Sequence, residues 1–484
     1  MKHVNPSRIA AAAVLAVLAG CGTQSKTPEA PPAMDLPAGW SDSTANSTRQ
    51  AWPDSTWWQH FGNDELTQLV QEGQRNNLDI AAAVSRVRQS EIQARIAGAP
   101  LVPNIDFGGG LTRQLPLSSG VATTSASGLF NASYEVDFWG KNKASLSAAE
   151  ASLRANVYDR ETVNLTVTCG IVSNYLQILS LRDRLVVARE NVANAEQVLN
   201  LLLAQSRAGS ASALDVARQR SVIADQQALI PDLQEQERDA LTVLAVLLGH
   251  TPQNFAVKEK GLAAIQMPEI APGMPSELLS RRPDIRRVEA QLAAANANID
   301  VARASLFPSI TLTGATGGQS SALVNLFSGP NLLANLGASI IAPIFDGGAL
   351  RNARDLAIEQ KKELVQVYRS TVMNALSEVE KSLGMIRSSE ERYKLKSVEV
   401  EQAKYAFDLS KIRYREGAED LMTVIDTQRS LSDAQNQLGE IKLDRLQATV
   451  SLYKALGGGW QDKPQPLPPV APMGSLDKAP RNQN

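Results

Sequence analysis

The two halves of this 484-residue chain carry the same sequence pattern, so the fold has to use one module twice. Five segments of the first half recur in the second half at nearly constant spacing. Two pairs are 205 residues apart, namely 77–80 with 282–285 and 101–103 with 306–308. Three pairs are 208 residues apart, namely Gly140 with Gly348, 207–209 with 415–417, and 248–249 with 456–457. The sequence therefore predicts a first repeat over residues 61–250 and a second over 276–458.

Each repeat is expected to begin with a helix and to switch to strands at a proline, Pro103 or Pro308. The residues that follow alternate between apolar and polar, which is the period of a strand with one apolar face. The apolar members are Phe130, Ala132, Tyr134, Val136 and Phe138 in the first copy and Leu336, Ala338, Ile340, Ala342 and Ile344 in the second. Each repeat thus predicts one strand hairpin. Such a hairpin suits a water-filled membrane barrel, and the alternative is a half-buried hairpin of a soluble protein.

After Gly348, apolar residues occupy every seventh position without interruption. They are Ile358, Val365, Val372, Val379, Ile386, Tyr393, Val400, Phe407 and Tyr414. The first copy follows the same phase with one exception, Asn164. A strict heptad predicts a long helix with a left-handed supercoil, and residues 349–416 would extend for about 100 Å. Gly209 and Gly417 are expected to end the two long helices, each followed by a shorter returning helix.

The first 21 residues indicate an exported lipoprotein. Lys2 and Arg8 precede an apolar run that is too short to span a membrane and is typical of a signal peptide. The run ends in Leu-Ala-Gly-Cys at 18–21, which resembles the lipobox of bacterial lipoproteins, whose cysteine receives a lipid. We therefore expect a signal peptide over 1–20 and lipid attachment at Cys21. The alternative is an ordinary signal peptide followed by a chance cysteine.

The segments outside the two repeats are polar and rich in proline, which is typical of linkers and surface segments. We expect a lipidated extended segment over residues 21–60. A linker is predicted over 251–275, and a polar C-terminal tail over 459–484.

Composition and motifs exclude several classes of function. Apart from Cys21 the chain has only Cys169, so there is no intramolecular disulfide framework and no cysteine-based metal site. Without the signal peptide, 46 basic residues stand against 50 acidic ones, which gives no basis for binding nucleic acid. His60 and His250 lie far apart, and no nucleotide-binding loop, hydrolase elbow or zinc-protease motif occurs. We therefore expect no enzyme, no metal and no cofactor beyond the lipid.

Strand closure predicts an oligomer. Two hairpins supply four strands per chain, and open strand edges in hydrocarbon cost several kcal/mol for each unpaired backbone group. Three copies would supply 12 strands, an even number within the range of bacterial barrels. Their twelve long-hairpin helices would form a second, helical cylinder. Beyond the signal peptide no apolar run approaches about 18 residues, so strands are the predicted means of crossing a membrane.

Several segments resemble the TolC-like outer membrane factor family. Leu-Leu-Ser-Arg-Arg-Pro-Asp-Ile at 278–285, leading to Ala-Arg-Ala-Ser-Leu-Phe-Pro at 302–308, is similar to the signature of its NodT-type branch. That branch holds the outer-membrane lipoproteins of resistance-nodulation-division (RND) efflux pumps. Residues 57–61, and 413–417 followed by 424–429, also match, and the resemblance covers about 57–457.

The resemblance implies a mixed α and β membrane protein in the bacterial outer membrane. It would be a homotrimer with a 12-stranded β-barrel, continued into the periplasm by an α-helical barrel about 100 Å long. The implied function is the exit duct of a tripartite efflux pump that exports small molecules. The implied partners are a periplasmic adaptor (a membrane fusion protein), an inner-membrane pump of the RND or ABC type, and outer-membrane lipid.

A candidate gate lies just past the second long helix. Its residues are spaced by four, three and four, which places them on one helix face: Met422, Asp426, Arg429 and Asp433. These positions match the periplasmic constriction of the resembling family, and threefold symmetry would stack them as rings. The first copy has different residues there, without the carboxylate of Asp426: Leu214, Arg218, Ser221 and Asp225. The second copy is therefore predicted to form the inner rings. The alternative is a solvated face with ordinary ion pairs.

The turns between long and returning helices are candidate docking sites for the adaptor. Their residues are Arg207, Gly209 and Ser210 in the first copy and Arg415, Gly417 and Ala418 in the second. They lie farthest from the outer membrane if the helices run straight, and their small residues would let another chain approach. The two tips differ, because Ser206 stands where the second copy has Tyr414. The alternative is a plain connecting turn without a partner.

Two other functions stay open from the sequence. One is a TolC-type exit duct for type I protein secretion, and the other is a structural coiled-coil lipoprotein tether, which would need no strand hairpins. The sequence does not determine the cargo, which could be a drug, metal, siderophore, solvent or peptide. It also does not determine the pump and adaptor, the state of the gate, or whether lipidation is essential.

We predict that the mature chain begins at a lipid-modified Cys21. The expected result in mass spectrometry is an amino-terminal peptide that starts at Cys21 and carries the mass of several acyl chains. Mature Cys21→Ser, exported with a non-lipoprotein signal peptide, is the control and should lack the added mass. An unmodified amino terminus at another residue would contradict the prediction.

Overall fold

The structure is a computed structural model that describes residues 34–41, 52–115, 120, 122–268, 270 and 273–460. Cys21 and most of the expected tail lie outside these residues. The chain forms two compact units. The sheet unit contains residues 87–157 and 287–369, and the helical unit contains 35–86, 158–286 and the chain from 370 onward. No helix in the described ranges has both the length and the apolar character needed to cross a membrane.

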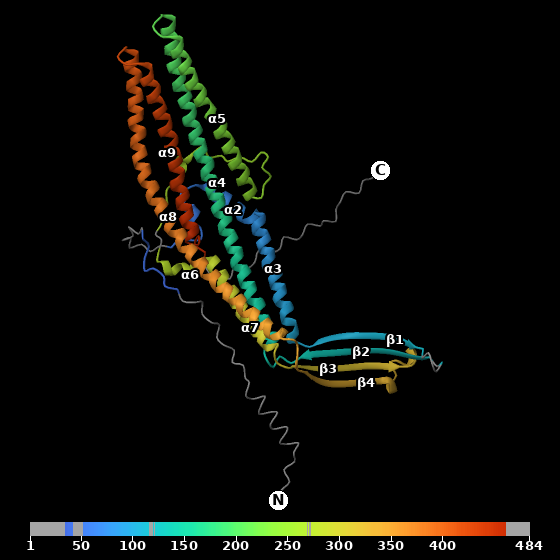
Figure 1. The fold of residues 1–484 in the computed structure, drawn as a ribbon. Helices are drawn as coiled ribbons and strands as arrows, with labels where there is room; N and C mark the ends of the chain where they lie inside the picture. Colours follow the sequence, from blue (N-terminus) through green and yellow to red (C-terminus); the bar gives the residue numbers. More distant parts are fainter. Residues whose placement is uncertain are drawn as a thin grey trace, which may run out of the picture. The chain divides into compact units, whose positions relative to one another are not determined.

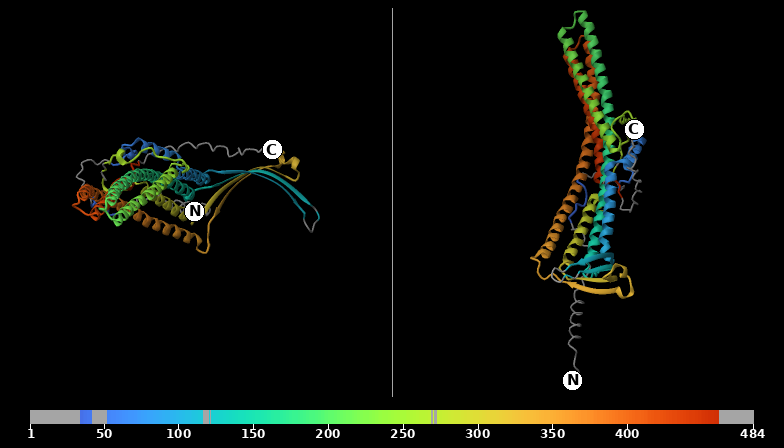
Figure 2. Two further views of the ribbon diagram at one scale, coloured as in Figure 1. Left: turned by 90° about the horizontal axis from the view of Figure 1, so that it is seen from above. Right: turned by 90° about the vertical axis from the view of Figure 1, so that its right-hand side faces the viewer.

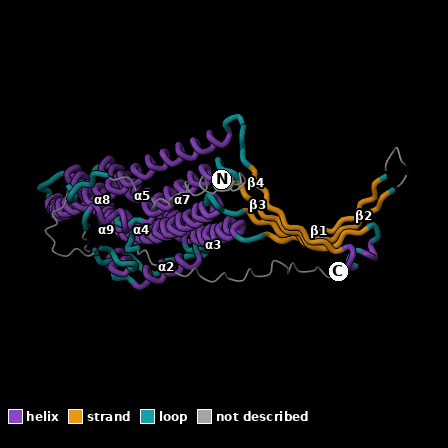
Figure 3. Tube along the Cα trace, turned by 90° about the horizontal axis from the view of Figure 1, so that it is seen from below, coloured by secondary structure: helices purple, strands orange, loops and turns teal. Residues whose placement is uncertain are grey.

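The sheet unit holds one antiparallel sheet of four strands (Figures 1 and 3). The strands are β1 (Asn104–Gln114), β2 (Thr123–Glu135), β3 (Ser309–Ser320) and β4 (Leu332–Ile341), and they lie in this order. The pairing of β2 with β3 joins the two hairpins, which are separated in the chain by the 173 residues 136–308. The expected hairpins are therefore present as neighbours in a single sheet.

Two strands end earlier than the alternating pattern predicts. The pattern extends to Phe138 and to Ile344, whereas β2 ends at Glu135 and β4 ends at Ile341. After β2 the chain turns so that the Asp137 carboxylate can accept hydrogen bonds from the backbone N–H groups of 142 and 143, at 2.9 and 2.8 Å. Capping of the following helix thus takes over from strand pairing. Asp346 plays the same part after β4.

Eight α-helices account for most of the described chain. The first four are α2 (Asp64–Asn76), α3 (Leu78–Gly98), α4 (Lys141–Arg207) and α5 (Ala213–Leu247). The other four are α6 (Leu278–Arg281), α7 (Pro283–Ala304), α8 (Ala349–Arg415) and α9 (Leu421–Ala455). Both α4 and α8 have 67 residues, which corresponds to about 100 Å at 1.5 Å per residue. The long helices and their returning partners occur as the heptad pattern predicts.

In the helical unit, the hairpins α4–α5 and α8–α9 lie side by side (Figure 2). The heptad positions of α8 are all buried or half-buried, so this stripe is the contact face of the helix. Near the tips, Phe407 packs with Leu202, Val216 and Val424 in one apolar cluster that contains residues of all four helices. Burial of the stripe explains why the heptad is so regular, since each seventh residue returns to the same seam.

The helix expected at the start of the first repeat is broken into α2 and α3, whereas the helix expected in the second repeat is continuous as α7 and is preceded by the short α6. The breaks fall at Asn77, between α2 and α3, and at Arg282, between α6 and α7. Both residues have extended backbones. Arg282 precedes Pro283, which disfavours a helical conformation of the residue before it. Asn77 instead caps α3, because its side-chain oxygen accepts hydrogen bonds from the N–H groups of 79 and 80.

At each break, a side chain donates a hydrogen bond to the carbonyl of the last residue of a returning helix, but the two side chains differ. Asn77 donates from Nδ2 to the carbonyl of Leu247 at 2.8 Å, and Arg282 donates from Nη1 to the carbonyl of Ala455 at 2.8 Å. Both carbonyls belong to the last residues of the returning helices, where backbone acceptors lack helical partners. Asn77 thus ties the start of α3 to the end of α5, and Arg282 ties the start of α7 to the end of α9.

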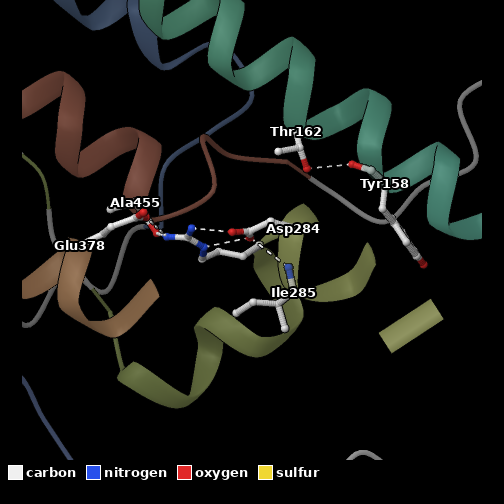
Figure 4. Close-up of polar contacts among 7 residues, drawn as sticks. Tyr158, Thr162, Asp284, Ile285, Glu378 and Ala455 are labelled. Carbon is white, nitrogen blue, oxygen red and sulfur yellow. Dashed lines mark hydrogen bonds and ion pairs between the residues drawn. The ribbon is translucent and has the colours of Figure 1, made fainter. Parts of the chain in front are cut away.

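The buried side chain of Arg282 also forms ion pairs with two carboxylates that are less buried, Asp284 and Glu378 (Figure 4). Its guanidinium contacts Asp284 Oδ2 and Glu378 Oε2, both at 2.7 Å, and its side chain is only 9% exposed. Burial alone would lower the pKa of Arg282, but Asp284 and Glu378 more than reverse this and raise it. The charge is therefore held firmly where α7, α8 and α9 meet.

A separate aromatic core surrounds the start of the first repeat. Trp57 stacks on Tyr453 with ring centroids 4.5 Å apart, and Phe61 packs edge-on to Trp57. His60 lies at the rim, with Nδ1 3.3 Å from the Tyr453 hydroxyl and Nε2 3.2 Å from Asp54. Cys169 is buried in the same cluster, and burial raises the pKa of its thiol to about 12. This cysteine is a small side chain buried in the apolar core.

We predict that Arg282→Leu destabilises the helical unit by about 1–3 kcal/mol, the range for leaving a buried hydrogen-bonding group without its partner. The Ala455 carbonyl would lose its Arg282 donor, and the Asp284 carboxylate would keep only the backbone N–H of Ile285. Arg303→Leu is the matched control, because Arg303 belongs to an exposed pair with Asp300 that contributes about 1 kcal/mol or less. Thermal unfolding followed by circular dichroism checks this. Equal midpoints for the two variants would contradict it.

Candidate functional site

The strand register separates the sheet into an apolar and a polar face. Directly opposed residues of antiparallel strands share a face, and Phe107 opposes Phe130, which opposes Thr316. The large apolar side chains of this face are exposed: Ile105, Phe107, Leu111, Phe130, Leu312, Leu336 and Ile340. The other face carries mainly polar side chains, including Asp106, Ser127, Asn131, Ser133, Thr313, Gln319 and Asn335.

This sheet can separate hydrocarbon from water. A soluble protein would cover so many apolar side chains with other elements, yet they are exposed within the described chain. On the polar face, the Asn131 side chain donates to Asp106 Oδ1 at 3.0 Å, a pairing typical of a hydrated surface. The arrangement therefore has the alternation found in strands that face lipid on one side and a lumen on the other.

The four candidate gate residues lie together on one exposed face of α9. Met422 is 39% exposed, and Asp426, Arg429 and Asp433 are exposed as well. The opposite face packs into the helical unit through Val424, Ile425, Gln428, Leu431 and Ser432. Within the described residues, no ion pair involves the side chains of the three charged gate residues. The helix thus presents an apolar side chain and three unneutralised charges in a row. The equivalent residues of α5 are also exposed: Leu214, Arg218, Ser221 and Asp225.

Both candidate docking tips are tight, capped turns. Gly209 and Gly417 adopt the left-handed conformation, with φ of 78° and 76°. In each turn the next N–H bonds to the carbonyl five residues back, Ser210 to Gln205 and Ala418 to Arg413, which closes a Schellman motif. A β-carbon at either glycine would meet open space. The conformation therefore selects glycine, while the surface above both tips is uncovered.

The helices that leave the tips begin at charged caps. Ser212 and Asp215 form a reciprocal capping box at the start of α5. The hydrogen bonds from the Ser212 side chain and backbone lower the pKa of the Asp215 carboxyl. At the second tip, Asp420 caps α9, and the hydrogen bonds from Thr423 lower the pKa of its carboxyl.

The difference between the tips has a structural role. Tyr414, which replaces Ser206 of the first copy, donates its hydroxyl to Gln205 Oε1 at 2.8 Å. Burial raises the pKa of this tyrosine hydroxyl. The Tyr414 side chain therefore ties the second tip to the first, a contact that the sequence comparison did not predict.

A buried polar seam between the hairpins was also missed from the sequence. Gln219 of α5 donates to the Ala195 carbonyl at 2.9 Å and lies 3.4 Å from Gln428 of α9. Farther along, Ser432 donates to Gln226 Oε1 at 2.8 Å. These side chains are almost fully buried. Helical-face counting could have found them, since Gln219 and Gln226 share a face with apolar neighbours.

The seam borders a cavity of about 250 Å³ between α4, α5 and α9. Its lining includes Asn191, Gln226, Ser432 and Gln435, and the buried Gln435 Oε1 has no partner among the described residues. Partly satisfied buried polar groups bind less firmly than a dry apolar core. The contact between the two hairpins is therefore polar and incompletely filled here, unlike the apolar cluster near the tips.

A family model described as outer membrane efflux protein matches residues 69–250 and 274–458. The chain belongs to the outer membrane efflux protein family. The double match follows the same division as the two sets of helices and strands. The family consists of outer-membrane channel proteins rather than enzymes, so this chain is an outer-membrane component of an efflux system. No group of metal-binding side chains occurs in the described residues.

Relatives and solved structures agree with this assignment. The chain is 45% identical to the pyoverdine export outer membrane protein OpmQ of Pseudomonas aeruginosa, over 89% of this chain and 91% of that protein. It is 31% identical to the toluene efflux pump outer membrane protein TtgC of Pseudomonas putida, over 92% and 94%. The fold is similar to the solved outer-membrane channel OprN, with a TM-score of 0.81, 26% identity and coverage of 89% and 99%.

Proposed function

We propose that three copies of this efflux protein form a continuous exit duct, with a 12-stranded β-barrel in the outer membrane and a helical barrel in the periplasm. The observation that carries the proposal is the sheet with one exposed apolar face and one polar face. Four strands per chain leave β1 and β4 with open edges. Pairing of β4 with β1 of the next copy satisfies those edges and keeps the apolar face toward lipid.

The helical unit supports association with further copies. Besides its buried heptad stripe, α8 carries a second apolar stripe on another face: Leu395, Val398, Tyr405, Leu409 and Ile412. The spacings of three, seven, four and three keep these residues on one side of the helix. All five are exposed in the single chain, with Tyr405 and Leu395 each at 66%. A helix with two apolar stripes needs a packing partner on each side. Its own chain covers the heptad stripe, and a neighbouring copy would cover the second stripe.

The remaining parts of the proposal concern anchoring and partners. Cys21 carries a lipid that adds an anchor to the barrel, since each buried methylene contributes roughly 0.8 kcal/mol. The helical barrel meets a periplasmic adaptor, which connects it to an inner-membrane pump that supplies energy. The relatives support efflux rather than protein secretion, because OpmQ and TtgC are named for exporting pyoverdine and toluene. These unlike cargoes suggest that the pump, and not the duct, selects the substrate.

Deletion of the gene is expected to trap the pump's cargo inside the cell, because the duct is the last step of export. A siderophore is the first compound class to test, given the 45% identity to the pyoverdine exporter. Comparing metabolites in cells and medium, with and without a plasmid copy of the gene, gives the measurement. Loss of a secreted protein with unchanged small molecules would favour secretion instead.

Met422, Asp426, Arg429 and Asp433 form the proposed periplasmic gate. Threefold symmetry places three copies of this exposed face around one axis, with a Met422 ring next to rings of charge. Repulsion among the three Asp426 carboxylates is offset by Arg429, one turn away on the same face. The closed state is therefore only moderately favoured, which allows a partner to open it.

We predict that the double variant Met422→Ala and Asp426→Ala raises single-channel conductance severalfold in planar bilayers. Both changes remove side chains from the proposed constriction. The matched control is Leu214→Ala with Arg218→Ala, at the equivalent exposed positions of α5, and it should have a smaller effect. Trimer assembly is verified for each variant. Unchanged conductance in assembled trimers would show that these residues do not form the narrowest point.

The tips around Arg207, Gly209 and Ser210 and around Arg415, Gly417 and Ala418 are the proposed adaptor contacts. Both turns are uncovered and compact, so another chain can approach the backbone closely. Single cysteines at Ser210 and Ala418 are expected to crosslink to cysteines in the adaptor in living cells. A cysteine at Lys394, which is exposed on α8 about 20 residues before the tip, is the control. Efficient crosslinking only at Lys394 would contradict tip docking.

A further inference from the structure

The loop between β3 and β4 is a compact structure of its own. It contains two short 3₁₀ turns, Leu323–Asn325 and Gly329–Asn331. Asn331 closes the loop, since its Nδ2 donates to the Asn325 carbonyl at 2.7 Å and lies 2.9 Å from Ser328 Oγ. Backbone bonds within the turns, from Asn325, Leu326, Ser328 and Asn331, satisfy several N–H groups locally. The loop is therefore held in one conformation by its own contacts.

This loop folds back over the apolar face of the sheet. A β-carbon on Gly128 would point toward Leu326 and Phe327 at 3.3 and 3.4 Å, and toward the Phe107 ring at 3.6 Å. Phe107 belongs to the apolar face, so the loop covers that same face. A β-carbon on Gly318, which opposes Gly128, would lie 1.9 Å from the Leu326 carbonyl oxygen. The two glycines therefore make room for the loop backbone.

Only one of the loop's large apolar side chains is covered by this docking. Leu326 is 7% exposed, whereas Leu323, Val324 and Phe327 are 66%, 90% and 65% exposed. Three neighbouring apolar side chains at the tip of a loop form a patch that calls for a partner. The patch continues the exposed apolar face that begins with Phe107 and Phe130.

The chemistry around the patch favours lipid as that partner. No charged residue occurs between Arg303 and Asp346, a stretch that includes β3, the loop and β4. A charged group would be costly in the apolar part of a bilayer. Irregular backbone is not tolerated deep in hydrocarbon, but the local turns suit the boundary between acyl chains and headgroups, where apolar side chains can insert.

We propose that the β3–β4 loop is a lipid-inserting element, in which Leu323, Val324 and Phe327 enter the acyl-chain region beside the ends of the strands. The inference rests on the barrel of the proposed function, which sets the apolar face toward lipid. It adds that this loop belongs to the membrane contact rather than to the aqueous exit of the duct. Docking of Leu326 onto Gly128 and Gly318 aims the three side chains outward.

Spin labels on single cysteines test the proposal in the assembled protein. The probe is Val324→Cys in a Cys169→Ala background, reconstituted in dioleoylphosphatidylcholine vesicles. Phe130→Cys, on the apolar face of β2, is the control for lipid. Gln319→Cys, on the polar face of β3, is the control for water. Collisions with oxygen report a lipid environment, and collisions with a water-soluble nickel chelate report an aqueous one.

The expected result is that the label at 324 behaves like the label at 130, with oxygen collisions dominating, and unlike the label at 319. If 130 reports lipid while 324 reports water, the loop proposal fails and the barrel stands. If 324 is shielded from both reagents, a neighbouring chain covers the patch and the loop proposal also fails. If 130 itself reports water, the proposed barrel fails and takes the loop proposal with it.

Discussion

Unpaired backbone at the two edges of the sheet is the constraint on which the larger assembly depends. Within the described chain, β1 and β4 each pair on one side only, while one face of the sheet exposes Phe107, Phe130 and Leu336. Water could satisfy the edges but not the apolar face, and lipid could satisfy the face but not the edges. Only pairing with further strands meets both demands. Within the chain, the pairing of β2 with β3 satisfies the backbone groups of the inner strands. In the proposed trimer, pairing between chains would satisfy those of β1 and β4.

The long helix α8 also has an apolar surface that its own chain leaves uncovered. The heptad of α8 buries one stripe against its own chain, while the stripe that includes Leu395 and Tyr405 stays exposed. A helix in the wall of a cylinder has a neighbour on each side, so two apolar stripes are what such a wall requires. The polar seam of Gln219 and Gln428 interrupts the apolar contact between hairpins.

The two similar halves of the chain are not equivalent in detail. They differ at the helix breaks, at the tips and on the exposed faces of α5 and α9. Asn77 and Arg282 hold corresponding carbonyls, but only the Arg282 site is reinforced by acidic partners. Tyr414 ties one tip to the other, whereas Ser206 at the matching position is too short to reach across. The exposed face of α9 carries Asp426 where α5 carries Arg218.

The sequence by itself determined the elements that depend on local period: the long helices from the heptads, the hairpins from alternation, and the turns at Gly209 and Gly417. It also placed the candidate gate on one helix face. Because these patterns are written within a few dozen residues, no knowledge of distant contacts was needed. The ion pair of Arg282 with Glu378, the pairing of Gln219 with Gln428 and the docking of the loop on Gly128 were decided only by the tertiary structure. Each is a contact between residues that are 96 or more positions apart in the chain, as Arg282 and Glu378 are. The period of a sequence pattern does not show which distant residues will be in contact.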